Sequence, residues 1–415
     1  MSGPIETNTV WSADMVRVQG DIEVADGVTL AVSPGVRVEF QGYFSLTVRG
    51  RLLALGEPEA RIEFTSSDPD SFAADSTLAG AWAGIRFPFT SEINQCSELK
   101  YCVIEYAKNA GDSLRGGALR VNGFSKLRVE NSVLRRNVAD FGGAFAFTHF
   151  ASPEITGCLI VENVAFIGGS AVHCLDAYPR LAACTIVANE DRNSEMFDPA
   201  AAIYAHLSKP RITGSILREN PSNYFEPTQI LYGKNWYTTW SDIGGGWPGG
   251  GNIDEDPLFV GEAPHPFALQ TMSPCVNAGP PDSAGLGLPA RDLGGTPRFL
   301  DGRIDMGAYE GDPQATGVGL AVGPFRLEPN LPNPFASATS IRFRLAESRS
   351  VRVDVCDAAG RRVARLADGV RGPGLHEVAW NGTHDRGRPL PSGVYFARLD
   401  AGPVSGSRKL ILLRR

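Results

Sequence analysis

The side chains best suited to bind a ligand are aromatic, basic and acidic residues near a repeated glycine pair. Aromatic rings stack on flat ligands such as sugar rings, and arginine and aspartate bond to hydroxyl groups. The same rings could instead pack inside the fold or cover its ends. We predict a ligand-binding surface, and packing within the fold is the alternative role for these side chains. The predicted residues are Trp82, Arg115, Arg120, Asp140, Phe141, Tyr204 and Trp236.

Catalysis on a polysaccharide needs acids that converge on one face, with a basic group in lyases or a second acid in hydrolases. The spacing predicts two outward rows, one of Arg115, Phe141 and Ile167 and one of Arg120, Ala146, Val172 and Tyr204. His173 aligns with Val121 and Phe147, which predicts an interior position. Neither row assembles acids, so no catalytic residue is assigned and the enzyme hypothesis is the weaker one.

Acidic residues cluster late in the sequence, at Asp254, Glu255 and Asp256 and again at Asp301 and Asp305. Calcium needs six to eight oxygens that converge from several segments. Acids in a loop rich in Gly and Pro more often serve turns and solvated surface. We therefore assign no metal site and no cofactor, and calcium stays as the alternative.

Five segments of the chain repeat one pattern. They begin with LKYCVIEYA at Leu99 and end with ITGSILREN at Ile212. Each segment places a small residue three positions after an apolar one and, in four of the five, an asparagine eight positions after it. The small residues include Cys102, Cys158 and Cys184; the asparagines are Asn137, Asn163, Asn189 and Asn220, the first three spaced by 26 residues. Gly116-Gly117, Gly142-Gly143 and Gly168-Gly169 also recur every 26 residues.

This period predicts an all-β fold, a right-handed parallel β-helix with one turn in about 26 residues. The repeated segments are short, β-branched and interrupted by Gly, Asn and Pro, which is typical of strands and corners rather than helices. In a solenoid, equivalent residues of successive turns stack on each other. We therefore expect a structural ladder of asparagines at one corner and a second ladder of small buried thiols and hydroxyls. A Cys158–Cys184 bridge is an alternative that the fold does not require.

Composition and charge limit the partners. The formal net charge is −7, which argues against nucleic acid, and no apolar run is long enough for a transmembrane helix. The opening residues lack the basic start and apolar run of a signal peptide. Together with the C-terminal region discussed below, this predicts a secreted or cell-surface protein whose signal peptide has been removed.

The region after the repeats carries three motifs in order: Asp256 to Phe259 (DPLF), Ser273 to Gly279 (SPCVNAG) and Asp305 to Glu310 (DMGAYE). In this order they resemble the closing turns of secreted bacterial β-helix proteins that are similar in fold to pectin lyases. The resemblance covers about residues 5–312, and we place the β-helix domain at 1–314. It implies a fold that carries polysaccharide lyases and hydrolases but also non-catalytic proteins.

A linker at 315–326 precedes a segment of short alternating strands at 327–415, which predicts a small immunoglobulin-like β-sandwich. Its motifs include Pro332 to Phe335, Asp357 to Arg361, Trp380 to Gly382, Ser392 to Phe396 and Lys409 to Leu412. They resemble the FlgD-like domain found as a C-terminal sorting module in type IX secretion substrates. The resemblance implies secretion machinery as a partner, with export followed by release or anchoring.

Three functions remain open. The first is a surface-associated binding, adhesive or structural module, with an extracellular polysaccharide as its partner. The second is a polysaccharide lyase or glycoside hydrolase whose site is built by loops at 66–80 and 190–200. The third is an extracellular element that self-associates, with solenoids stacked or side by side.

Overall fold

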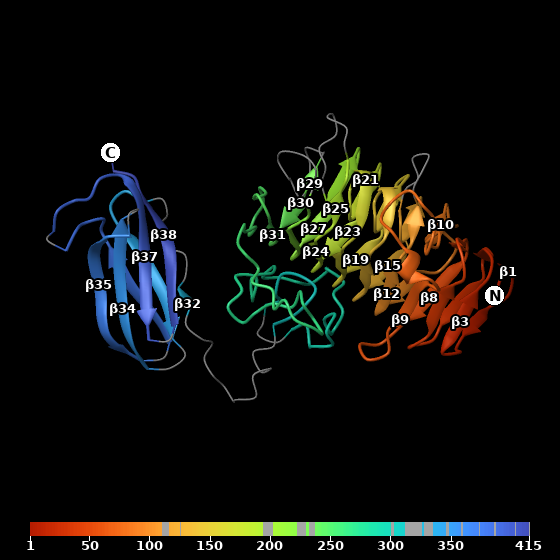
Figure 1. The fold of residues 1–415 in the computed structure, drawn as a ribbon, viewed down its shortest axis with the longest axis horizontal. Helices are drawn as coiled ribbons and strands as arrows, with labels where there is room; N and C mark the ends of the chain where they lie inside the picture. Colours follow the sequence, from red (N-terminus) through yellow and green to blue (C-terminus); the bar gives the residue numbers. More distant parts are fainter. Residues whose placement is uncertain are drawn as a thin grey trace. The chain divides into compact units, whose positions relative to one another are not determined.

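The computed structural model describes residues 1–109, 116–124, 126–193, 202–221, 230–231, 237–299, 303–311, 326–327, 335–345, 348–357, 360–372, 374–385, 387–402 and 404–414. Arg115, Trp236, Asp301 and the linker at 315–325 lie outside these residues. The chain divides into two compact units, Met1–Gly311 and Asp312–Arg415. Both units are built from β-strands, drawn as arrows in Figure 1. Among the described residues, no helix is long and apolar enough to cross a membrane.

The first unit is a parallel β-helix, as the sequence period predicts. Within the described residues, strands of successive turns pair into three nine-stranded parallel sheets, here named A, B and C. Sheet A contains β1 (Gly3–Ile5), β4 (Ile22–Val24), β7 (Leu46–Val48), β10 (Ile85–Pro88), β14 (Leu119–Asn122), β18 (Phe145–Thr148), β22 (Val172–Leu175), β26 (Ile203–His206) and β29 (Ile230–Leu231).

The other two long sheets continue each turn. Sheet B contains β2 (Thr9–Trp11), β5 (Thr29–Val32), β8 (Arg51–Leu55), β11 (Ser97–Lys100), β15 (Leu127–Glu130), β19 (Glu154–Thr156), β23 (Arg180–Ala182), β27 (Arg211–Thr213) and β30 (Tyr237–Thr239). Sheet C contains β3 (Met15–Val18), β6 (Arg37–Phe40), β9 (Ile62–Ser66), β12 (Cys102–Glu105), β16 (Val133–Arg135), β20 (Leu159–Val161), β24 (Thr185–Val187), β28 (Ile216–Arg218) and β31 (Asp242–Ile243).

A shorter sheet D follows sheet C in the middle turns. Its strands are β13 (Lys108–Asn109), β17 (Val138–Phe141), β21 (Val164–Gly168) and β25 (Glu190–Asp191). The loop predicted at 66–80 contains one short 3₁₀ helix, η1 (Pro69–Ser71). Lys108 fastens this loop to β13, because its buried ammonium donates to the carbonyl of Ala73, at 2.6 Å, and to that of Thr77.

The asparagine row forms a hydrogen-bonded ladder inside the corner after sheet C. The backbone N–H and the side-chain amide of Asn137 both donate to Oδ1 of Asn163, at 3.1 and 2.9 Å. Asn163 bonds to Asn189 in the same way, and Asn189 to Asn220. All four side chains are buried. The left-handed corner residue is the one before each asparagine, such as Arg136 at φ 55° and Glu162 at φ 56°, and not the asparagine itself.

The thiols and hydroxyls form a second interior row at the corner between sheets B and C. The Ser132 hydroxyl accepts the N–H of Cys102 at 3.0 Å, and the Ser215 hydroxyl accepts that of Cys184 at 3.1 Å. All seven cysteines are free, so the alternative Cys158–Cys184 bridge is not formed. Burial raises the pKa of Cys102 to about 12 and that of Cys184 to about 11, which leaves these thiols protonated and unreactive.

The glycine row departs from the predicted period by one residue. Strand β21 carries a bulge, so that Phe141 pairs with Gly168 and Phe145 with Val172. The left-handed corner glycines are therefore Gly116, Gly142 and Gly169, at φ 75°, 71° and 67°. The prediction that Gly168-Gly169 matches Gly142-Gly143 was wrong, because one extra residue in β21 lengthens that turn to 27 residues.

The second unit contains two antiparallel sheets that share one hydrophobic core. One sheet contains β32 (Arg326–Leu327), β33 (Thr339–Leu345) and β36 (Gly374–Trp380), and the other contains β35 (Arg362–Arg371), β34 (Arg349–Asp357), β37 (Gly393–Ala401) and β38 (Val404–Leu412). Trp380 lies in this core and packs edge-on against Tyr395, with ring centroids 5.3 Å apart. The small antiparallel β domain predicted for this region is confirmed.

We predict that Asn163→Ala lowers the free energy of unfolding by about 3 kcal/mol or more, because it removes the acceptor of the buried Asn137 backbone N–H and the bonds that the Asn163 amide donates to Leu134, Val161 and Asn189. The matched control is Cys158→Ser, since serine already fills this row at Ser132 and Ser215; it should cost less than about 1 kcal/mol. Denaturant unfolding measures both. Equal losses for the two variants would contradict a special role for the asparagine ladder.

Candidate functional site

The segment after the last turn runs back along the outer face of sheet C (Figure 1). Arg61 donates to the carbonyl of Leu293 at 2.6 Å, and the Tyr101 hydroxyl donates to that of Asp292 at 3.0 Å. Further along the sheet, the N–H of Ala308 donates to the Thr185 hydroxyl at 3.0 Å. We call residues 253–311 the return segment. It joins turns that lie far apart in the sequence and covers part of the sheet.

A groove of about 480 Å³ lies between the return segment and sheet C. Its floor is made by outward-facing side chains of β12, β16 and β20, and its opposite wall by the return segment. We call it the sheet C groove, and its lining residues are Arg61, Val103, Val133, Arg135, Arg136, Leu159, Val161, Glu162, Pro264, His265, Pro266, Phe267 and Tyr309. Its volume lies in the range of pockets for small ligands.

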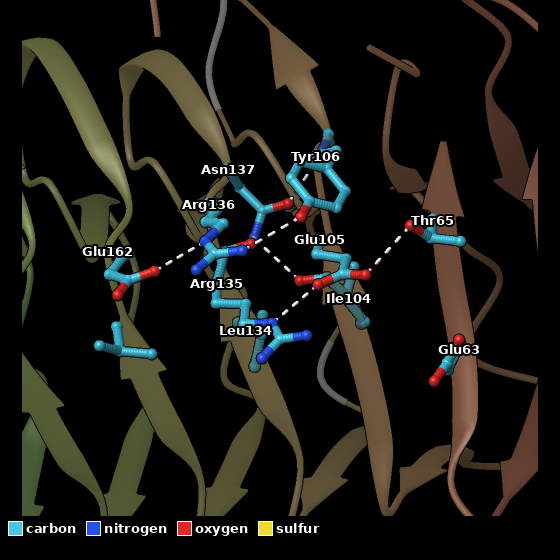
Figure 2. Close-up of polar contacts among 12 residues, drawn as sticks. Glu63, Thr65, Ile104, Glu105, Tyr106, Leu134, Arg135, Arg136, Asn137 and Glu162 are labelled. Carbon is cyan, nitrogen blue, oxygen red and sulfur yellow. Dashed lines mark hydrogen bonds and ion pairs between the residues drawn. The ribbon is translucent and has the colours of Figure 1, made fainter. Parts of the chain in front are cut away.

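Two arginines that line the sheet C groove, Arg135 and Arg136, are each paired with a glutamate, as Figure 2 shows. Arg135 donates from Nε to Glu105 at 2.7 Å, and the Thr65 hydroxyl donates to the other oxygen of Glu105 at 3.1 Å. Arg136 donates to Glu162 at 2.8 Å and to the Tyr106 hydroxyl at 3.2 Å. These bonds hold the arginines in place and raise the pKa of Arg136 further above its usual value.

The wall opposite Arg135 and Arg136 carries aromatic side chains, and the rings of His265 and Tyr309 are neutral near pH 7. His265 packs against Tyr309, with ring centroids 5.3 Å apart. Burial raises the pKa of Tyr309 to about 12, and burial, aided by the charge of Arg61, lowers the pKa of His265. The site therefore combines arginine donors on one side with uncharged rings on the other, an arrangement that suits a ligand with both hydroxyl groups and flat apolar faces.

None of the predicted surface residues that the structure describes lies in this groove. Trp82 is fully buried, stacks on Phe40 at 4.1 Å and donates its indole N–H to the carbonyl of Glu105. The prediction that Trp82 contacts a ligand was therefore wrong, because the alternative of interior packing holds. Arg115 and Trp236 lie outside the described residues.

Of the other predicted residues, Arg120 and Tyr204 lie on sheet A, and Asp140 and Phe141 lie on β17 of sheet D. Arg120 pairs in register with Ala146, Ala146 with His173, and His173 with Tyr204. The predicted row therefore contains His173 in place of Val172, and the alignment of His173 with Val121 and Phe147 was wrong, because the bulge in β21 shifts the register; the predicted burial of His173 is confirmed. His173 lies between two rings, 4.8 Å from Phe141 and stacked on Tyr204 at 5.5 Å. Asp140, next to Phe141 in β17, is almost fully buried.

The acids of the closing motifs act as structural acceptors. Asp305 accepts the N–H groups of Asn277 and Gly311, at 2.6 and 2.7 Å. Glu310 forms a buried ion pair with Arg298 at 2.9 Å. Asp254 pairs with an arginine, Arg218, at 2.8 Å. Among the described residues there is no group of three or more His, Cys, Asp or Glu side chains that could hold a metal ion.

Sequence reasoning missed the sheet C groove. Its floor and its wall lie more than 100 residues apart in the chain. The available signals were the closing motifs and the proline-rich, aromatic run from Pro264 to Phe267, but neither indicated which sheet the return segment covers.

Comparison with known proteins bears on the second unit. Residues 331–402 match the family model of the FlgD Ig-like domain. A solved structure, the crystal structure of dimeric latent PorU from Porphyromonas gingivalis, aligns over 23% of this chain and 10% of that chain, with 18% sequence identity and a TM-score of 0.19. The chain thus spans a small part of PorU. No curated protein matches the chain.

We predict that Asp242→Asn removes a pH dependence from the stability of the last turn. Asp242 is buried beside Arg218 and Cys275, and burial raises its pKa to about 6. A carboxyl group whose pKa is higher in the folded state stabilises the fold at low pH, and this contribution disappears as the pH rises through 6. The stability of the natural chain relative to the variant should therefore fall by about 2 kcal/mol between pH 4 and pH 7. Thermal unfolding at both pH values measures it; a constant difference would contradict the assignment.

Proposed function

We propose that this chain is a secreted, cell-surface β-helix that binds an extracellular saccharide in the sheet C groove, with its C-terminal domain serving export or anchoring. One observation carries the binding proposal. Glu162, the one acidic residue among the described residues that line the groove, is already bonded to Arg136, and Glu105, which lies outside the lining, is bonded to Arg135. The groove thus offers donors and aromatic rings to a ligand, while its acidic residue is engaged.

The paired acids favour binding over cleavage. A glycoside hydrolase needs one carboxyl group to protonate the leaving oxygen and a second to attack or to activate water. Both oxygens of Glu105 are already engaged, one by the Nε of Arg135 and the other by the Thr65 hydroxyl. The edge of the groove therefore suits the positioning of a ligand better than proton transfer to it.

The export proposal rests on the second unit. Its match to the FlgD Ig-like domain agrees with the sequence motifs that resemble sorting modules of type IX secretion substrates. In a protein of this kind the sandwich is read by the secretion machinery, and the β-helix is the part delivered to the surface. Adhesion to a saccharide-coated surface would follow from binding in the sheet C groove.

To test binding, Val133→Trp should fill the groove and lower saccharide affinity at least about tenfold, because Val133 faces outward on its floor. The control Arg128→Trp adds the same ring to the outer face of β15 in the same turn and should bind as the natural chain does. A glycan array selects the ligand, and calorimetry measures affinity. Release of new reducing ends or unsaturated products from any polysaccharide would overturn the binding proposal in favour of an enzyme.

To test export, residues 327–415 can be fused to a periplasmic reporter in a host that has a type IX secretion system. The fusion should reach the outer surface or the medium, and the reporter alone should stay in the periplasm. Fractionation with a protease-accessibility assay measures the location. Equal retention of both proteins in the periplasm would contradict a sorting role for this domain.

A further inference from the structure

A line of exposed apolar side chains follows the corner between sheets A and B. Phe89 and Leu207 each come directly after a strand of sheet A, Phe150 lies one residue further on in its turn, and Ile93 belongs to the same connection as Phe89. Their exposed fractions are 64% for Phe89, 82% for Ile93, 64% for Phe150 and 73% for Leu207. We call these four residues the corner ridge. Apolar side chains gathered on a surface mark an interaction site more often than isolated ones do.

The backbone of the corner ridge makes these residue types unexpected. Phe89, Phe150 and Leu207 have left-handed conformations, with φ of 42°, 63° and 51°. Glycine and asparagine adopt this conformation readily, whereas bulky side chains do so at a cost. Tyr101 has the same conformation at another corner, but its ring is buried and its hydroxyl bonds to Asp292. Phe89, Phe150 and Leu207 are exposed, so burial does not offset the cost of their left-handed backbone conformations.

The rings of the corner ridge lie along the stack rather than projecting singly. Gly123 is the corner residue of the turn after Phe89, and a Cβ atom there would lie only 2.9 Å from the Phe89 ring. The ring therefore extends over Gly123 toward His149, with centroids 5.2 Å apart. Phe150 stacks on Tyr178 in the following turn at 6.4 Å. From Phe89 to Leu207 the ridge spans four turn spacings, roughly 19 Å.

We propose that the corner ridge is the contact surface between two copies of this chain, packed side by side and antiparallel about a two-fold axis at Phe150. The charges that flank the ridge are complementary in this arrangement. Glu92 lies at the Phe89 end and Lys209 at the Leu207 end, both exposed. One turn inward, Lys126 and Asp176 lie on either side of Phe150, and Lys126 already pairs with Glu92 of its own chain at 3.8 Å.

A two-fold axis places each end of one ridge against the opposite end of the other. Glu92 of one copy then meets Lys209 of the second, which adds a basic partner to its own Lys126, and Phe89 packs against Leu207. A parallel arrangement would instead bring Lys209 against Lys209. The corner ridge lies between sheets A and B and is separate from the sheet C groove, so this proposal stands whether or not the groove binds a saccharide.

Asparagine substitutions separate docking from folding. Phe89→Asn with Leu207→Asn removes apolar surface but suits the left-handed backbone, so we expect an unchanged or higher melting temperature together with a dissociation constant for the dimer raised at least about tenfold. Val370→Asn, at an exposed apolar position of the second unit, is the control and should leave association unchanged. Sedimentation velocity on the full chain across the micromolar range measures the dimer.

A charge exchange tests the antiparallel geometry. Glu92→Lys or Lys209→Glu alone should weaken the dimer, and the double variant should restore it, because each copy then supplies both exchanged partners. A natural chain that stays monomeric over this concentration range would overturn the proposal, as would a dimer that survives the asparagine substitutions. A double variant no better than the single variants would overturn the antiparallel arrangement.

Discussion

The buried asparagine ladder is the interaction on which the rest of the β-helix depends. Each side chain satisfies a backbone donor of the preceding turn and carbonyl groups at the corner, as Asn163 does for Asn137, Leu134 and Val161. A buried ladder of this kind allows one register, because a slip by one residue would bury outward side chains and leave the amides without partners. This register sets the outward rows of sheet C, and therefore the floor of the groove.

The return segment depends on the same stack but uses different chemistry. It docks through tyrosine, arginine and threonine side chains that reach its backbone, and it is braced internally by the buried Arg298–Glu310 pair. Burial raises the pKa of Glu310, so a charged Glu310 depends on its arginine partner. Asp305 and Glu310 of the last closing motif thus join the segment's own loops.

Much of the fold could be predicted from the sequence, because a solenoid repeats its interactions at a fixed spacing. The period and the parallel sheets follow from rows such as Asn137, Asn163 and Asn189, and the sandwich follows from the short alternating strands at 327–415. The outward-facing rows were harder to predict, because one bulge residue in β21 brings His173 into register with Ala146 with no change in composition, although its side chain stays buried. Trp82 was misassigned because a tryptophan next to a loop has the same sequence pattern whether it faces inward or outward. The groove escaped prediction because its wall docks from more than 100 residues away.

The central claim is that the return segment is an integral part of the β-helix and forms the wall of a binding groove on sheet C. Hydrogen–deuterium exchange with mass spectrometry tests it directly. If the claim holds, the backbone amides of Met306, Gly307 and Ala308, which bond to Cys275, Gly214 and Thr185, exchange as slowly as those of the asparagine ladder. Fast exchange across residues 253–311, with the ladder still protected, would mean that the segment is not docked and would contradict the groove.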